Sequence, residues 1–292
     1  MPGQLFWLRG VEGKMELREA LQSGIQRLEA ARVGSPRLNA ETLLMFVLGS
    51  DRAFLFAHSE RVLTPDEVLR YDQALGERAR GVPAQYVTGH QEFWGLDLLV
   101  SPAVLIPRPE TEHVVETVLE LVEGRSGLKI VDVGTGSGCI ALALAKELTD
   151  AEIHATEISP EALEIARANA ARNQLETRIH FYETDLLAGL EDMVFDFVVS
   201  NPPYVAESEA DTVEAQVRKF EPRLAVFSGA TGLEVYRRLI PQANQVLSPD
   251  GWLVLEIGFR SRDQVAKLLE DWRDLRSKND LQGIPRVMAA RK

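Results

Sequence analysis

The four residues from Asn201 to Tyr204, Asn-Pro-Pro-Tyr, have side chains that could hold a planar nitrogen group. They follow Phe195 to Ser200, a β-branched and aromatic run typical of a strand. Because two successive prolines fix φ twice and lack backbone donors, the segment would be a rigid loop with free carbonyls. Asn201 adds a side-chain acceptor and donor, and Tyr204 adds a flat aromatic face. On these residues alone a simple turn would be the better interpretation.

A second chemical feature lies upstream, where Gly134 to Gly138 has the sequence Gly-Thr-Gly-Ser-Gly after the apolar run Lys129 to Val133. Glycines at the end of a strand let the backbone turn tightly and approach a ligand closely. A glycine-rich turn by itself is compatible with a dinucleotide, a phosphate or no ligand.

Two acidic residues follow at the ends of the next two expected strands. Glu157 comes 19 residues after Gly138, where a carboxylate can accept both hydroxyls of an adenosine ribose. Asp185 follows the third strand and is placed to meet an adenine edge. Each acid alone is more often a solvated loop residue. Three features in order at successive strand ends are much less expected by chance, which favours a nucleoside-containing cofactor.

Two cofactors fit this pattern, a dinucleotide and S-adenosylmethionine. A dinucleotide site usually has the spacing G-x-G-x-x-G. Here the third glycine, Gly138, comes one residue early, and no basic residue in the turn could meet a pyrophosphate. The Asn201–Tyr204 segment would have no task in hydride transfer, whereas it could serve methyl transfer to a planar nitrogen. The pattern therefore favours S-adenosylmethionine.

Strands and helices that could position these residues alternate from residue 128 onwards. The expected strands are 129–133, 152–156, 178–182, 195–199 and 252–257, and the expected helices are 140–148, 160–173 and 232–247. This alternation predicts a parallel sheet with helices on both faces. Ligands in such folds bind at the carboxyl ends of the strands. Ser248 to Gly251 predicts a turn before the last of these strands.

The part of the chain before residue 107 has a different pattern. Apolar residues recur at helical spacing over 16–80. Ser35-Pro36 predicts a capped helix start, and Thr64 with Glu67 predicts a capping box. Glycines and prolines then punctuate two short runs, which predicts a hairpin. We expect a helical-bundle domain at 1–80, a β-hairpin linker at 81–106 and an α/β cofactor-binding domain at 107–292.

Composition limits the class of protein and its partners. Residues 1–88 contain 11 basic and 11 acidic residues, and residues 89–292 contain 21 and 33, so the net charge of −12 belongs to the second part. Binding to a phosphate backbone favours the opposite sign, so we expect no direct nucleic-acid contact. The single cysteine, Cys139, fits a reducing cytoplasm. We see no signal peptide in residues 1–13, no membrane span and no metal-ligand cluster.

Several segments together resemble bacterial release factor glutamine N5-methyltransferases, the PrmC/HemK family of class I S-adenosylmethionine-dependent methyltransferases. The resemblance covers nearly the whole chain and rests on Pro107–Glu112, Gly134–Gly138, Ser200–Val205, Glu221–Ala225 and Asp280–Val287. Asn-Pro-Pro-Tyr alone is shared with adenine N6-methyltransferases. The resemblance implies a Rossmann-like methyltransferase domain at 107–292 after a small helical substrate-recognition domain and the hairpin.

The resemblance also implies roles for individual residues. The residues that would hold the cofactor are Gly134, Thr135, Gly136, Ser137 and Gly138 at its methionine part, Glu157 at the ribose, Asp185 and Leu186 at the adenine, and Asn201. Phe93 would cover part of the pocket. The substrate glutamine would be held by Asn201, Pro202, Pro203 and Tyr204, with Asn201 and Pro202 as the catalytic acceptors.

The implied reaction is methyl transfer from S-adenosylmethionine to the side-chain nitrogen of glutamine in the Gly-Gly-Gln loop of a peptide chain release factor, by a cytoplasmic monomer. Two alternatives stay open: methylation of a glutamine in a ribosomal protein, and N6-methylation of adenine in nucleic acid. A cofactor-binding protein without catalysis is disfavoured, because a sensor has no need for the acceptors of the Asn201–Tyr204 segment.

Overall fold

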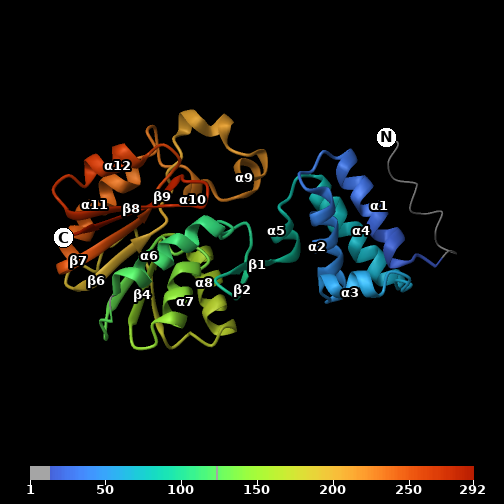
Figure 1. The fold of residues 1–292 in the computed structure, drawn as a ribbon, viewed down its shortest axis with the longest axis horizontal. Helices are drawn as coiled ribbons and strands as arrows, with labels where there is room; N and C mark the ends of the chain where they lie inside the picture. Colours follow the sequence, from blue (N-terminus) through green and yellow to red (C-terminus); the bar gives the residue numbers. More distant parts are fainter. Residues whose placement is uncertain (1–13, 123) are drawn as a thin grey trace. The chain divides into compact units, whose positions relative to one another are not determined.

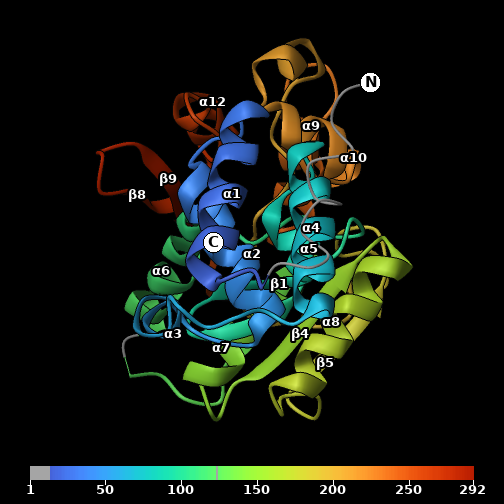
Figure 2. The same ribbon diagram turned by 90° about the vertical axis from the view of Figure 1, so that its right-hand side faces the viewer.

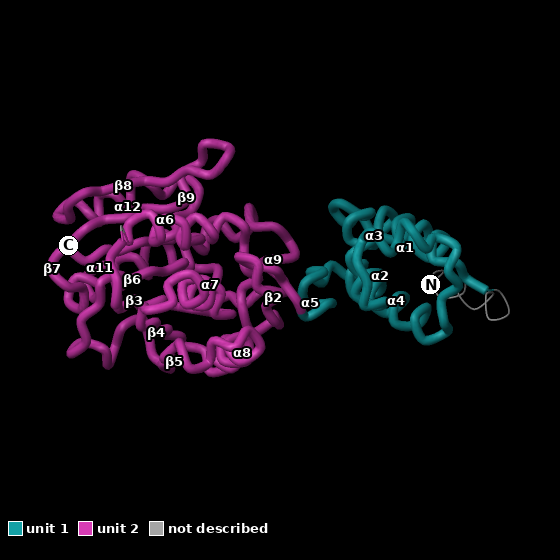
Figure 3. The backbone as a smooth tube through the Cα atoms, turned by 60° about the horizontal axis from the view of Figure 1, so that its bottom comes forward, with its two compact units in different colours: residues 1–89 teal, residues 90–292 magenta. Residues whose placement is uncertain are grey.

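The computed structural model describes residues 14–122 and 124–292. The chain divides into two compact units, residues 1–89 and 90–292, drawn in teal and magenta in Figure 3. Residues 1–13, in which we expect no signal peptide, lie outside the described residues. No helix within the described ranges is long and apolar enough to cross a membrane.

The first unit is a helical bundle. Its helices are α1 (Leu17–Ala30), α2 (Pro36–Leu48), α3 (Arg52–Ala57), α4 (Pro65–Ala79) and α5 (Ala84–Thr88). Helices α1, α2 and α4 lie side by side (Figures 1 and 2) and enclose a core of their own, in which Leu28, Leu43 and Tyr71 are buried. The helical pattern in the sequence is confirmed. All the residues of this core that the structure describes belong to the first unit.

The two expected helix starts in this unit differ in their caps. The capping box is present, since the Thr64 hydroxyl accepts from the Glu67 N–H and the Glu67 carboxylate accepts from the Thr64 N–H. Ser35 precedes Pro36 at the start of α2, but its side chain makes no capping hydrogen bond and its backbone is left-handed, with φ of 47°. The helix start expected at Ser35-Pro36 is therefore confirmed, with Ser35 at the N-cap position and Pro36 in the first turn, but the Ser35 side chain does not cap the helix.

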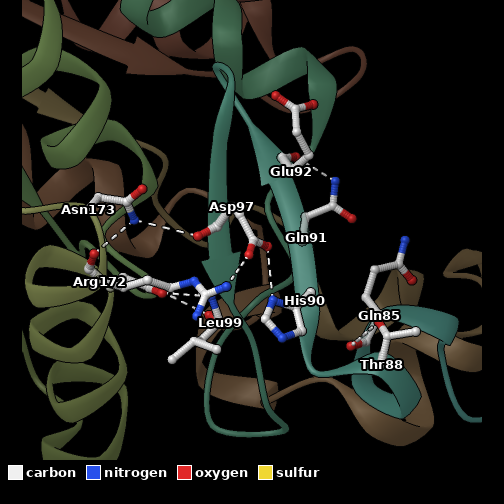
Figure 4. A network of polar contacts seen from close by, with 10 residues as sticks. Gln85, Thr88, His90, Gln91, Glu92, Asp97, Leu99, Arg172 and Asn173 are labelled. Atoms are coloured by element: carbon white, nitrogen blue, oxygen red, sulfur yellow. Dashed lines mark hydrogen bonds and ion pairs between the residues drawn. The ribbon is translucent and has the colours of Figure 1, made fainter. Parts of the chain in front are cut away.

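The second unit begins with the expected hairpin, β1 (His90–Phe93) paired antiparallel with β2 (Leu96–Leu99). Figure 4 shows how Asp97 of this hairpin pairs with His90 and accepts a hydrogen bond from Arg172 of α8 (Pro160–Arg172). The buried Asn169 side chain, also in α8, bonds to both backbone groups of Leu99. These contacts fasten the hairpin to the second unit.

A seven-stranded sheet forms the centre of the second unit. Its strands are β3 (Lys129–Val133), β4 (Glu152–Glu157), β5 (Ile179–Glu183), β6 (Phe195–Ser200), β7 (Leu247–Glu256), β8 (Arg273–Asn279) and β9 (Pro285–Arg291). The spatial order is β5-β4-β3-β6-β7-β9-β8. The first five strands in this order are parallel, as expected, whereas β9 pairs antiparallel with both β7 and β8. The antiparallel edge was not predicted.

The turn expected at Ser248 to Gly251 is wrong as a break before the strand. These residues lie within β7, where Phe195 of β6 pairs with Leu247 and Phe197 pairs with Trp252. The intervening residues of β7 therefore form a bulge opposite a single residue of β6. Turn-forming residues can lie within a strand here because residues in a bulge take no part in the regular hydrogen-bond ladder.

Helices cover both faces of the sheet (Figure 1). One face packs against α6 (Glu112–Val122), α7 (Cys139–Glu147) and α8, and the other against α11 (Glu234–Val246) and α12 (Arg262–Leu268). Successive strand residues point to opposite layers, so Ile130 lies in the first core and Val131 in the second. The remaining helices are η2 (Pro109–Thr111), η3 (Glu207–Thr212), α9 (Ala215–Phe220) and α10 (Arg223–Val226).

The strand order reverses direction between β3 and β6. From β3 the chain moves outwards through β4 to β5, and it then returns to β6 on the other side of β3. In a parallel sheet, a crevice opens beyond the carboxyl ends of the strands at such a reversal. The glycine-rich turn follows β3 and Asn201 follows β6, so the fold places them on either side of this crevice.

We expect Gly24→Ala to destabilise the bundle. A Cβ at Gly24 would lie 2.2 Å from the Tyr71 hydroxyl, which is buried and donates to the Ala40 carbonyl. The overpacking should lower the free energy of unfolding by about 1–3 kcal/mol, against a helix-propensity gain of about 1 kcal/mol. Thermal unfolding would measure the difference. Gly34→Ala is the control, because a Cβ there meets nothing within 4 Å; equal stability of the two variants would contradict the clash.

Candidate functional site

A cavity of about 250 Å³ lies at the carboxyl ends of β3, β4 and β6, in the second unit. Its wall combines segments that are far apart in the sequence. The expected site residues in the wall are Gly134, Thr135, Gly136, Ser137, Glu157, Asp185, Leu186, Asn201 and Pro203. The structure thus brings the glycine-rich turn, both acids and the start of the Asn201–Tyr204 segment around one hollow.

The glycines of the turn have two different tasks. Gly134 and Gly136 have φ of 71° and 55°, and a Cβ built on either would meet nothing within 4 Å. Their backbones are therefore exposed to the open space of the cavity. A Cβ on Gly138 would instead lie 3.2 Å from Leu142 Cδ1, and Gly138 is absent from the cavity wall as far as the described residues define it. Gly138 serves close packing at the start of α7.

A buried carboxylate beneath the turn holds its shape. Oδ2 of Asp132 accepts from the Thr135 hydroxyl at 2.6 Å and from the Ala141 N–H at 3.2 Å. Burial raises the pKa of Asp132 to about 7. These two bonds tie the end of β3 to the middle of the turn and to the first turn of α7.

Glu157 is part of the same scaffold. Its carboxylate accepts backbone N–H bonds from Gly136 at 2.9 Å, Ile158 at 2.9 Å and Ser159 at 3.0 Å. The side chain is therefore fixed at the edge of the glycine-rich turn. Two carboxylate oxygens offer about four acceptor sites, so capacity for a ligand hydroxyl remains after these three bonds.

Asp185 and Leu186 line the far end of the cavity. The Asp185 carboxylate accepts from the guanidinium of Arg238, which also contributes to the wall. Leu186 has a left-handed backbone with φ of 56°, a conformation that L residues adopt at a cost. Sequence reasoning missed Arg238, which lies in α11 and carries no motif of its own.

The Asn201–Tyr204 segment is held at both ends. Before it, the Ser200 hydroxyl donates to the Val133 carbonyl at 2.7 Å. After it, Val205 forms an isolated parallel bridge with Phe227. Among the described residues that line the cavity, Asn201 and Pro203 are present, whereas Pro202 and Tyr204 are not. The Tyr204 ring packs on Gly258, where a Cβ would come within 2.8 Å of it.

Behind Asn201 lies a network of buried polar side chains. The Asn201 Nδ2 donates to Thr111 Oγ1 at 3.0 Å, and that hydroxyl donates to Glu256 Oε2 at 2.7 Å. The Tyr204 hydroxyl donates to the other oxygen of Glu256 at 3.4 Å. Burial raises the pKa of Glu256 to about 7 and also raises the pKa of Tyr204. Sequence reasoning missed Thr111 and Glu256, although an acid within the apolar run 253–257 was an available signal.

Another buried carboxylate, that of Glu221, joins two segments that border the cavity. Glu221 accepts from the Ile106 N–H at 3.1 Å and from the Arg108 guanidinium. Arg108 itself lines the cavity, as do Pro222 and Leu224 next to Glu221. The two sequence motifs that begin at Pro107 and Glu221 are therefore neighbours in space.

The expected role of Phe93 is wrong. This residue is 1% exposed in the core that β1 shares with α6, and it is absent from the described cavity wall. The hairpin packs its apolar side into the core, together with Leu96 and Leu98, so the Phe93 ring does not face the cavity. Burial also raises the pKa of the Cys139 thiol to about 12, so this thiol is a poor source of a nucleophilic thiolate.

Comparison with known proteins connects this geometry to a family. The family model described as "PrmC N-terminal domain" matches residues 19–89, and the one described as "Methyltransferase small domain" matches residues 111–225. The release factor glutamine methyltransferase of Koribacter versatilis is 54% identical over 95% of this chain and 99% of its own. The protein of that name from Moorella thermoacetica is 47% identical over 84% and 86%.

Solved structures support the fold. The catalytic domain of hMettl16, in complex with the MAT2A 3′UTR hairpin 6, superposes with a TM-score of 0.56 at 20% identity, covering 79% of this chain and 84% of that one. A methyltransferase from Pyrococcus furiosus gives a TM-score of 0.51 at 20% identity, over 68% and 89%. At this identity the likeness concerns the fold alone.

The chain is thus an S-adenosylmethionine-dependent methyltransferase with a Rossmann-like domain. The cavity fits that cofactor on its own evidence, because Gly134 and Gly136 leave backbone exposed to open space and carboxylates stand at the ends of β4 and β5. With close relatives matching along nearly its whole length, the chain belongs to the release factor glutamine methyltransferase family.

Proposed function

We propose that this protein transfers a methyl group from S-adenosylmethionine to the side-chain nitrogen of the glutamine in the Gly-Gly-Gln loop of peptide chain release factors. The observation that carries the proposal is a single cavity with the glycine-rich turn on one side and Asn201 on the other. The names of its relatives supply the substrate class.

The cofactor would be held by residues that have been placed in the cavity. Gly134 to Ser137 would receive its methionine part, Glu157 its ribose hydroxyls, and Asp185 with Leu186 its adenine. Gly138 would act indirectly by letting α7 approach the sheet. When bound, the cofactor supplies a methyl group that is already activated by its sulfonium.

The residues of this chain would orient and polarise the amide. An amide nitrogen is a poor nucleophile because its lone pair is delocalised, so the site must hold it in line at near-attack distance. We propose that Asn201 Oδ1 and the Pro202 carbonyl accept its two N–H bonds. As the carbon–nitrogen bond forms, positive charge develops on nitrogen, and both acceptors stabilise it. The surplus proton is then acidic and leaves to water.

The Asn201–Tyr204 segment is held rigidly, as the orientation of a substrate amide requires. Pro202 and Pro203 stiffen the loop, and Tyr204 anchors it by packing on Gly258 and donating to Glu256. We propose that Tyr204 supports the substrate site from behind, and that Pro203 contacts the glutamine from the cavity wall.

We propose that the protein works as a monomer in the cytoplasm, where release factors act. We also propose that residues 1–80 recognise the body of the release factor, because this part has a separate core and exposes large apolar side chains, among them Leu38 and Phe56.

Asn201→Ala should lower kcat on the order of 100-fold while leaving the Kd for S-adenosylmethionine within about threefold. The reason is that the Asn201 oxygen acts on the substrate amide, whereas most of the contacts proposed for the cofactor come from residues other than Asn201. Labelled methyl transfer to release factor, paired with calorimetric cofactor binding, would measure both quantities. Asn244→Ala, at an exposed site of α11, is the matched control. Equal loss in kcat and cofactor affinity would argue against this role.

Gly136→Ala should weaken cofactor binding at least tenfold. Its Cβ would enter the cavity, and its positive φ of 55° adds backbone strain of about 1–2 kcal/mol. Gly127→Ala introduces comparable strain at φ of 63°, without a neighbour within 4 Å and away from the cavity. Titration calorimetry should therefore show weaker cofactor binding in Gly136→Ala than in Gly127→Ala, although the two variants should have similar thermal stability. A matching loss of affinity in Gly127→Ala would mean that strain, not the cavity, is responsible.

Removal of residues 1–80 should abolish methylation of intact release factor and leave cofactor binding unchanged, because the cavity lies wholly within residues 103–238. The same labelled assay would test the alternatives if a ribosomal protein and DNA or RNA are offered as acceptors beside release factor. Full activity of the shortened protein on release factor would contradict the recognition role. Preferential labelling of either alternative acceptor would replace the proposed substrate.

A further inference from the structure

Asn201 is connected to the interior of the second unit by a directed series of hydrogen bonds. Its Nδ2 donates to Thr111 Oγ1 at 3.0 Å, and Thr111 Oγ1 donates to Glu256 Oε2 at 2.7 Å. The three residues come from the loop after β6, from η2 and from the end of β7. Thr111 and Glu256 are only 1% and 3% exposed, so water has little access to these bonds.

The direction of each bond follows from the chemistry of the groups. An ionised carboxylate only accepts, so the single hydroxyl proton of Thr111 must point towards Glu256. The Thr111 oxygen then has only lone pairs to offer to Asn201, and Asn201 must present its NH₂ group to it. The amide oxygen of Asn201, at the other end of the same planar group, is left for the cavity that Asn201 lines.

We propose that Glu256, acting through Thr111, fixes which end of the Asn201 amide faces the substrate, so that Thr111 and Glu256 are positioning residues for methyl transfer. This inference rests on the proposed function, in which the substrate amide donates to Asn201 Oδ1. With the Asn201 amide reversed, two NH₂ groups would face each other and the substrate nitrogen would lose an acceptor.

The environment of Glu256 supports this role. Among residues 14–122 and 124–292, the carboxylate of Glu256 forms no ion pair, and Arg286, which pairs with Glu110 and Asp280, acts on it only at longer range. A buried carboxylate without a cationic partner is costly unless its acceptors are used. Here the carboxylate oxygens accept from the hydroxyls of Thr111 and Tyr204. Tyr204 belongs to the Asn201–Tyr204 segment, and Thr111 is bonded to Asn201. A strand end in an apolar core would be more stable with an apolar residue if Glu256 served packing alone.

A set of matched variants tests the proposal. Thr111→Val keeps the shape of the side chain but removes the hydroxyl, so Asn201 can turn over; Thr111→Ser keeps the hydroxyl. Glu256→Gln can donate to Thr111, which would then direct its own proton at Asn201 and reverse the amide. Tyr236→Phe removes a buried hydroxyl that donates to the main-chain oxygen of Glu256, not to its carboxylate, and controls for lost stability.

Methylation of release factor should be measured at pH 8.5, above the pKa of about 7 of Glu256. We expect Thr111→Val and Glu256→Gln to lower kcat at least tenfold while the Kd for S-adenosylmethionine stays within about threefold. Thr111→Ser should recover most of kcat, and Tyr236→Phe should retain it even if it melts at a lower temperature. Wild-type kcat in Thr111→Val, or no recovery in Thr111→Ser, would overturn the proposal.

A second readout does not depend on activity. In the ¹⁵N–¹H spectrum, the side-chain NH₂ of Asn201 can be identified as the pair of signals that disappears in Asn201→Ala. Its exchange with water should be slow in the wild type and in Thr111→Ser, and at least tenfold faster in Thr111→Val. Equal exchange rates in the wild type, Thr111→Ser and Thr111→Val would overturn the proposed orientation of the Asn201 amide. Slow exchange in a wild-type protein that does not methylate release factor would refute the proposed function and leave the orientation of Asn201 standing.

Discussion

The parallel pairing of β3 with β6 is the constraint on which the site depends. Asp132 pairs with Val199 near the ends of these strands, so the chain leaves both strands at the same edge of the sheet. The glycine-rich turn and Asn201 are far apart in sequence but are brought together by this one pairing. The Ser200 hydroxyl, bonded to the Val133 carbonyl, locks the two ends against each other.

Buried carboxylates do most of the fine positioning around this edge. Asp132 and Glu157 hold the glycine-rich turn, Glu221 joins the two segments bordering the cavity, and Glu256 lies behind Asn201. Each, when ionised, accepts bonds whose direction is fixed, because an ionised carboxylate has no proton to donate. Carboxylates in such places cost stability unless their acceptors are used. Asp132 carries part of this cost, because its Oδ2 accepts two bonds while its buried Oδ1 has no partner among the described residues. The acidic residues of the second unit thus include carboxylates that are buried inside it.

The sequence was informative wherever local chemistry decides the structure. The glycine-rich turn, the strand at Phe195–Ser200 and the Thr64 capping box could all be predicted because a few neighbouring residues determine them. The family resemblance added the substrate class, and the comparisons support it. Predictions failed where distant contacts decide. Phe93 is buried by α6, and the residues Ser248–Gly251 lie in a bulge against β6.

The network behind Asn201 was the largest omission, because no local pattern reveals it. Thr111 is 90 residues from Asn201 and 145 residues from Glu256 along the chain. Only the assembled fold, in which residues of η2, the loop after β6 and the end of β7 meet, brings these side chains within hydrogen-bond distance. A hydroxyl in a helix start and an acid in an apolar strand look unremarkable when each is considered separately.

The most direct test of the central claim is to locate the methyl group on the product. Release factor incubated with this protein and methyl-labelled S-adenosylmethionine would be digested, and the labelled peptide fragmented in a mass spectrometer. We predict one label, on the side-chain nitrogen of the glutamine in the Gly-Gly-Gln loop. Label on any other residue, or an unlabelled release factor beside a labelled nucleic acid, would contradict the account.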